Sequence, residues 1–85
     1  MIVADVPTKR NHALIYREIP GFIRALRTRA GMTQVELASK LRESQVYVTR
    51  CESGSRRVDV AEFIQIAKAL GLDPVEVFAE LVGRR

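Results

Sequence analysis

Helix-start and helix-stop residues follow one another so closely between residues 31 and 74 that this segment can form only short helices. Thr33 with Glu36 and Asp59 with Glu62 have the spacing of capping boxes, and Ser44 is a further N-cap candidate. Helix-ending glycines stand at Gly31, Gly54 and Gly71. Together with the segment before Gly31 and the one after Pro74, this punctuation predicts five helices and an all-α fold.

Apolar residues recur at helical spacing in these segments, as in Ile19, Ile23, Leu26 and Ala30, or in Val60, Phe63, Ile64, Ala67 and Leu70. Pro20 is expected to break any helix that passes through it, but it suits the first turn of a new one. We therefore expect residues 1–18 to form an N-terminal arm with at most a short helix, residues 19–82 to form the folded domain, and residues 83–85 to form a tail.

Residues 33–54 are predicted to form two short helices joined by a four-residue turn. In a helix-turn-helix of this layout, one helix enters the major groove of DNA and the other supports it. Val48 and Cys51 lie at spacing i and i+3 and should point inward. The outer face of the second helix is then left to Gln45, Val46, Thr49 and Arg50.

The chain resembles helix-turn-helix regulators of the Cro and phage-repressor type, the XRE family. The matching residues are Gln34, Leu37-Ala38, Leu41, Ser44-Gln45, Val48, Arg50 and Glu52-Ser53-Gly54, followed by residues 56–74. The resemblance covers about residues 19–82, and it implies a five-helix, lambda-repressor-like DNA-binding domain. The family usually has glycine where this chain has Arg42, so Arg42 should either adopt a strained left-handed conformation or alter the turn.

Four residues are the candidates for reading base edges: Gln45, Val46, Thr49 and Arg50. A glutamine side chain can donate and accept at once, which matches the N6 and N7 atoms of adenine. Thr49 and Val46 offer methyl groups to thymine, and Arg50 can reach a guanine or a phosphate. The alternative is that these polar side chains are merely solvated on an exposed helix face.

Candidates for contacts with the DNA backbone are Gln34, Ser44, Tyr47, Arg56, Arg57, Lys40 and Arg29. Such contacts add affinity without sequence information. Each basic residue could equally be a solvated surface charge, and Tyr47 could instead fold back over the core. The family resemblance implies that Gln34 contacts a phosphate and braces Gln45. It also implies that Arg27 pairs with Glu52 and fixes the recognition helix to the scaffold.

The last predicted helix is apolar on more than one side. A small domain needs only one buried stripe per helix, and surplus apolar surface usually marks an interaction site. We therefore expect Val77, Leu81 and Val82 to form a dimer interface. The alternative is a tightly packed terminal helix without a partner.

Composition excludes several classes of function. The 85 residues suffice for one small domain, and the net charge of +4 is compatible with a nucleic-acid partner. One cysteine and one histidine, Cys51 and His12, provide neither a disulfide framework nor a metal site. There is no glycine-rich phosphate loop and no apolar run of membrane-spanning length. The first residues, MIVADVPTK, are not expected to act as a secretory signal, because the apolar stretch is short and contains Asp5. We expect a cytoplasmic protein that is not an enzyme and has no cofactor and no small-molecule ligand.

These observations predict a sequence-specific transcriptional regulator that binds double-stranded DNA as a homodimer on a palindromic operator. A different reading is an antitoxin or another protein-interaction module, whose main partner is a protein. The first predicts strong, salt-dependent binding to DNA, and the second a tight protein complex through the last helix or the arm.

Overall fold

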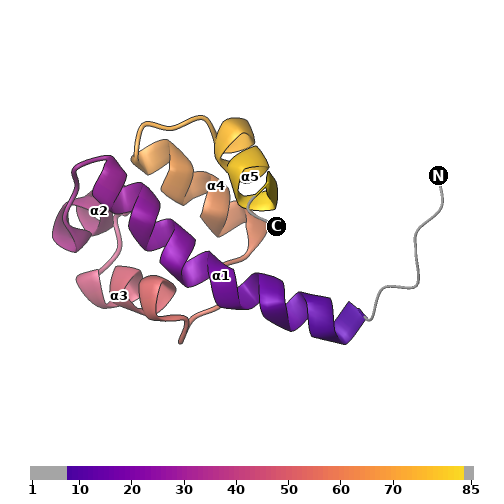
Figure 1. The fold of residues 1–85 in the computed structure, drawn as a ribbon. Helices are drawn as coiled ribbons and strands as arrows, with labels where there is room; N and C mark the ends of the chain where they lie inside the picture. The colour runs from indigo at the N-terminus through magenta and orange to yellow at the C-terminus, as the bar shows by residue number, and fades with distance from the viewer. Residues whose placement is uncertain (1–7, 84–85) are drawn as a thin grey trace.

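Five α-helices make up the part of the chain that the computed structural model describes, which is residues 8–83 for the backbone and residues 14–83 for the side chains. They are α1 (Thr8–Arg29), α2 (Gln34–Leu41), α3 (Gln45–Ser53), α4 (Val60–Ala69) and α5 (Pro74–Gly83) (Figure 1). Residues 8–83 contain no strand, so the predicted all-α fold is confirmed. None of the helices in this range has the length and apolar character that crossing a bilayer requires. The expected arm at residues 1–7 and tail residues 84–85 lie outside the described residues.

α1 continues through Pro20 without a break. The prediction that Pro20 interrupts the helix is therefore wrong, and residues 8–18 belong to α1. Proline in a helix interior removes one N–H donor and costs on the order of 3 kcal/mol. Packing offsets this cost, because Pro20 is half-buried and its Cγ lies only 3.2 Å from where a Cβ on Gly54 would stand. The first turns of α1 extend past the other helices (Figure 1).

The predicted capping boxes are present at α2 and α4. The Thr33 hydroxyl accepts from the Glu36 N–H at 3.1 Å, and the Glu36 carboxylate accepts from the Thr33 N–H at 2.8 Å. Asp59 and Glu62 make the same reciprocal pair at 2.7 and 2.9 Å. Each box satisfies two N–H groups that have no partner inside the helix, so both helix starts are determined by local sequence.

Arg42 adopts the left-handed conformation in the turn between α2 and α3, with φ 57° and ψ 41°. Within residues 8–83 it is the only residue other than glycine with positive φ. Its N–H donates to the Ser39 carbonyl at 3.1 Å, and the Glu43 N–H donates to the Ala38 carbonyl at 2.9 Å. The chain thus keeps the turn that glycine would favour, at a cost of about 1–2 kcal/mol for an L-residue.

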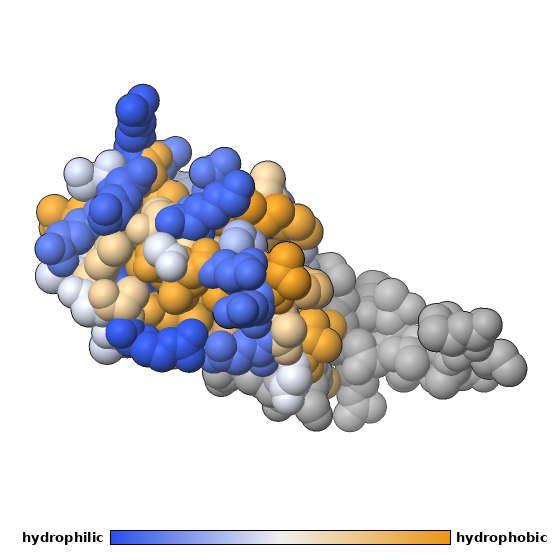
Figure 2. All heavy atoms as spheres, turned by 90° about the horizontal axis from the view of Figure 1, so that it is seen from above, coloured by the Kyte–Doolittle hydropathy of each residue, from blue (hydrophilic) through white to orange (hydrophobic). Residues whose placement is uncertain are grey.

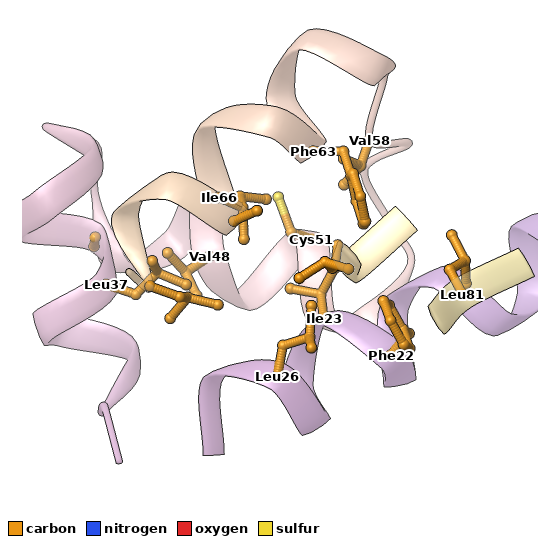
Figure 3. Packing of buried hydrophobic residues seen from close by; sticks show 14 residues of the cluster. Phe22, Ile23, Leu26, Leu37, Val48, Cys51, Val58, Phe63, Ile66 and Leu81 are labelled. Atoms are coloured by element: carbon orange, nitrogen blue, oxygen red, sulfur yellow. The ribbon is translucent and has the colours of Figure 1, made fainter. Parts of the chain in front are cut away.

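One apolar core joins all five helices (Figure 3). Its most deeply buried large side chains are Phe22, Ile23, Leu26, Leu37, Val48, Cys51 and Ile66. Ala38 is 3% exposed, as expected for the small residue where two helices cross closely. Val60 is 72% exposed, so its predicted place on the inner stripe of α4 is wrong. Val60 is the first residue of α4, and the buried residues of this helix begin only at Phe63, so Val60 lies outside the part of α4 that packs against the core.

The predicted dimer interface on α5 requires correction. Val77 and Leu81 are 2% and 8% exposed in the single chain, because they pack into its own core. Val82 is 57% exposed and shares the outer face of α5 with Val75 and Phe78. α5 does carry two apolar faces, but the inner one contains two of the three residues that we assigned to a partner.

Candidate nucleic-acid interface

α3 is held by its inner face, so its outer face has a fixed orientation. Val48 and Cys51 are each 1% exposed, and burial raises the pKa of the Cys51 thiol. The Ser44 hydroxyl caps the helix by accepting from the Tyr47 N–H at 3.2 Å. All four predicted base-contacting residues are exposed: Gln45, Val46, Thr49 and Arg50.

Gln34 joins the start of α2 to the outer face of α3. The Gln34 Oε1 accepts from the Gln45 Nε2 at 3.4 Å and lies 3.0 Å from the Thr49 hydroxyl. The same hydroxyl lies 3.0 Å from the Gln45 carbonyl, so its single proton has two acceptors within reach. On its other side, the Gln34 Nε2 donates to the Glu52 Oε1 at 3.0 Å. Gln34 therefore orients two polar side chains of the outer face of α3, Gln45 in the first turn and Thr49 in the second.

The predicted contact between Arg27 and Glu52 is present and anchors this network. Arg27 Nε donates to Glu52 Oε2 at 2.5 Å, and Arg27 Nη2 donates to Glu52 Oε1 at 3.1 Å. A third Arg27 bond reaches the Met32 carbonyl at 2.7 Å. The side chains are only 13% and 3% exposed, and the bonds to Glu52 raise the pKa of Arg27. A bidentate pair shielded from water in this way holds α3 against α1 at a defined angle.

A second polar cluster lies on the other side of α3. The Tyr47 hydroxyl donates to Glu62 Oε2 at 3.0 Å, and Arg56 Nε donates to the same oxygen at 3.0 Å. The Arg56 guanidinium stands 5.0 Å from the centre of the Tyr47 ring. Tyr47 also packs against the core, which favours the alternative in which it folds back. Burial is the main cause that raises the pKa of Tyr47, and the bond to Glu62 adds to it.

The other predicted backbone-contacting residues are spread more widely. Lys40 and Arg57 are exposed, and the Arg57 guanidinium lies 4.6 Å from the centre of the Tyr16 ring. Arg29 is placed elsewhere: its guanidinium bonds the Glu80 carboxylate of α5 at 2.8 and 3.3 Å. Arg29 comes two residues after Arg27, about 200° further round the helix. It therefore faces α5 and does not join the network at α3.

Two residues of this surface were missed by the sequence reasoning. Exposed Arg24 lines the same hollow as Arg27, Gln34 and Thr49. It stands one helical turn before Arg27, and that spacing could have indicated it. Glu62 was recognised only as a helix cap. Nothing local in the sequence shows that its second carboxylate oxygen also accepts hydrogen bonds from Tyr47 and Arg56.

The site has the composition of a binding surface. No cluster of three or more metal-ligating side chains occurs among the described residues. Two shallow hollows flank the outer face of α3. One contains Arg24 and Gln34, and the other contains Val46, Arg50 and Arg56. Exposed cations, amides and methyl groups are therefore presented side by side, which is the mixture that reads DNA edges and phosphates.

Comparison with known proteins agrees with this geometry. The family model of a helix-turn-helix domain matches residues 21–80. An XRE-family like protein from Pseudomonas syringae pv. tomato str. DC3000 has 34% identity and a TM-score of 0.82, with 91% of this chain and 94% of that chain covered. A search of curated proteins gives no match.

Two regulators with solved structures are also similar. The restriction-modification controller protein C.Esp1396I, solved as a tetramer in complex with its natural 35 base-pair operator, has 28% identity and a TM-score of 0.74, covering 81% of this chain and 91% of that chain. The clp gene regulator ClgR from C. glutamicum has 27% identity and a TM-score of 0.72, covering 82% and 91%. This chain belongs to the helix-turn-helix domain family and is a DNA-binding transcriptional regulator of the XRE type.

Proposed function

We propose that this regulator binds a specific palindromic operator as a homodimer, through the outer face of α3. The network from Arg27 through Glu52 and Gln34 to Gln45 carries the proposal, because it holds an amide ready at the start of an exposed helix. Base readout depends on donors and acceptors whose positions are set before DNA arrives. The proposed role is binding without catalysis, and its proposed place is the cytoplasm.

The hydrogen bonds leave Gln45 with the atoms that adenine requires. One Nε2 proton is directed to Gln34, so the second proton can donate to adenine N7 while Oε1 accepts from N6. Gln34 likewise has one Nε2 proton directed to Glu52 and a second that can donate to a phosphate. Thr49 and Val46, which is 54% exposed, add methyl groups for contact with thymine.

The proposed backbone contacts use Gln34, Ser44, Lys40, Arg56 and Arg57, which border α3 or its flanking loops. Tyr47 leaves the set, because it packs against the core and its hydroxyl donates to Glu62. Arg24 joins this set because it shares a hollow with Gln34 and Thr49. Arg29 leaves it, because its guanidinium bonds Glu80 on the α5 side.

Selection of bound sequences from random DNA, followed by affinity measurements on the selected site, tests the proposal. We expect Gln45→Ala and Thr49→Ala each to weaken specific binding by about 5- to 150-fold, the equivalent of about 1–3 kcal/mol per lost base contact. Gln65→Ala, which removes an exposed glutamine of α4, is the matched control and should bind normally. If no sequence is enriched, or if the two α3 variants bind like wild type, this proposal is wrong.

The homodimer requires a contact surface, and the outer face of α5 is the revised candidate. Val75, Phe78 and Val82 are 75%, 53% and 57% exposed, and they lie at spacings of three and four on one face. Apolar residues gather over this side of the molecule (Figure 2). A single recognition helix reads few base pairs, so two heads on half-sites about 34 Å apart would supply the specificity.

Sedimentation at micromolar concentration tests this part of the proposal. Val82→Glu should give a folded monomer with weak operator binding, whereas Val35→Glu, at an exposed valine of α2, should sediment like wild type. A wild-type protein that is monomeric, and a selected site without two-fold symmetry, would contradict the homodimer. They would favour the protein-interaction reading, with another protein covering α5.

A further inference from the structure

The carboxylate of Glu62 joins three segments around the recognition helix. Its Oε1 accepts from the Asp59 N–H at the start of α4. Its Oε2 accepts from the Tyr47 hydroxyl of α3 and from Nε and Nη2 of Arg56 in the following loop. The Glu62 side chain is 17% exposed, and the Arg56 side chain is 47% exposed.

We propose that Glu62 is a positioning residue of the DNA-binding surface, which holds Arg56 against Tyr47 so that the outer edge of the guanidinium faces DNA. The inference rests on the proposed function, since it assumes that α3 and its flanking loop meet DNA. Arg56 shares a hollow with Val46 and Arg50 of the α3 outer face, which places it beside the proposed base readers.

The geometry of Arg56 supports this role. Glu62 receives one edge of the guanidinium and Tyr47 supports one face of it, at 5.0 Å from the ring centre. A guanidinium has five N–H donors, and Glu62 takes two of them. The donors on the opposite edge can reach a phosphate or a base. An arginine fixed in advance loses less side-chain entropy on binding than a mobile one.

Electrostatics alone leads to the opposite expectation. An acidic residue close to a polyanion repels it, so removal of its charge should strengthen DNA binding. The hydrogen bonds from the Asp59 N–H, Arg56 and Tyr47 lower the pKa of Glu62, so its carboxylate is charged at neutral pH and this repulsion applies to the wild-type protein. Positioning and simple charge repulsion therefore predict opposite signs for the same substitution.

Glu62→Gln is the decisive variant, and Glu36→Gln is its matched control. Both glutamates occupy the N3 position of a capping box, three residues after the N-cap, and glutamine retains that role. In Glu62→Gln the amide nitrogen cannot accept from Arg56 and Tyr47 while the amide oxygen caps α4. We expect the Glu62 variant to bind the selected operator about 3- to 10-fold more weakly than wild type. The Glu36 variant should bind equally or more tightly.

A double-mutant cycle separates positioning from a general loss of structure. If Glu62 acts through Arg56, then Glu62→Gln should change affinity less than two-fold in an Arg56→Ala background. Glu62→Gln should also keep the far-UV circular dichroism of wild type, because its cap is retained, although at neutral pH it loses the stability that the charged carboxylate contributes. Equal or tighter operator binding by Glu62→Gln, or the same loss in both backgrounds, would overturn the inference. Wild-type protein that binds no DNA in the same assay would refute the proposed function, and this inference with it.

Discussion

Arg27→Ala offers the most direct test of how the recognition helix is held. The substitution removes two bonds to Glu52 and one to the Met32 carbonyl. The Glu52 carboxylate, which is 3% exposed in the wild-type protein, then keeps only the hydrogen bond from the Gln34 amide within this network. Breaking one partner of a buried pair costs about 3–5 kcal/mol, mostly because the other charge stays desolvated.

This magnitude is large for a chain of 85 residues. Domains of this size are stable by roughly 4–13 kcal/mol in total, and each kcal/mol shifts the melting temperature by about 4–8 °C. We therefore expect Arg27→Ala to melt roughly 12–40 °C below wild type, or to be unfolded at room temperature. Far-UV circular dichroism during thermal and urea unfolding, at one fixed protein concentration, measures this effect.

A double variant distinguishes the buried charge from lost packing. Replacement of both Arg27 and Glu52 by methionine removes the stranded carboxylate, and apolar replacement of a buried pair is often neutral in stability. We expect this protein to recover most of the loss while still binding the operator more weakly, because Gln34 no longer has its anchor. A single Arg27→Ala variant within 1 kcal/mol of wild type would refute the reasoning. So would a double variant no more stable than the single.

Three further outcomes follow from backbone geometry and charge. Arg42→Gly should raise the unfolding free energy by about 1 kcal/mol in urea titrations, since glycine adopts positive φ without strain; an unchanged or lower value would show that the turn is not strained. Gly71→Ala should lower the unfolding free energy by about 1–2 kcal/mol, because the φ of Gly71 is 76°. Gly54→Ala should lower it by about 1 kcal/mol more than Gly71→Ala does, because of these two positions only Gly54 would bring a Cβ against the Pro20 ring. Equal losses for the two variants would argue against that contact. The pKa of Glu62 is lowered on folding by its bonds to the Asp59 N–H, Arg56 and Tyr47. The stability that its charge contributes is therefore fully present above its ordinary pKa of 4.5 and is lost as pH falls through the lower folded value. Urea titrations from pH 7 down to pH 3 should show a shallower decline in unfolding free energy for Glu62→Gln than for wild type, and identical curves would contradict the assignment.

Sequence reasoning succeeded where the physical cause is local. The capping boxes at Thr33 and Asp59 bring donor and acceptor together within four residues, so no distant contact is needed to recognise them. The inner stripe of α3 follows from helical period alone, and Val48 and Cys51 are buried as predicted. The contact between Arg27 and Glu52 spans 25 residues, and it was reached only through the family resemblance.

The errors arose where distant contacts decide the outcome. Pro20 stays inside a helix because neighbouring structure packs against its ring. Arg29 turns toward Glu80, 51 residues away, which no local pattern reveals. In α5 both faces are apolar, so helical period could not show that Val77 and Leu81 are the inner pair. Each case needed the relative placement of helices that are not adjacent in the chain.

The single oxygen of Gln34 that serves both Gln45 and Thr49 has a consequence for how this surface can change. Residues that share one acceptor are expected to show non-additive substitution effects. A substitution at Gln45 releases that acceptor to Thr49. If these two residues read neighbouring base pairs as proposed, replacing one should shift the preference at the base pair that the other contacts. Altered operator specificity in this protein would then require paired substitutions, and libraries that vary Gln45 and Thr49 together should yield binders that neither single series contains.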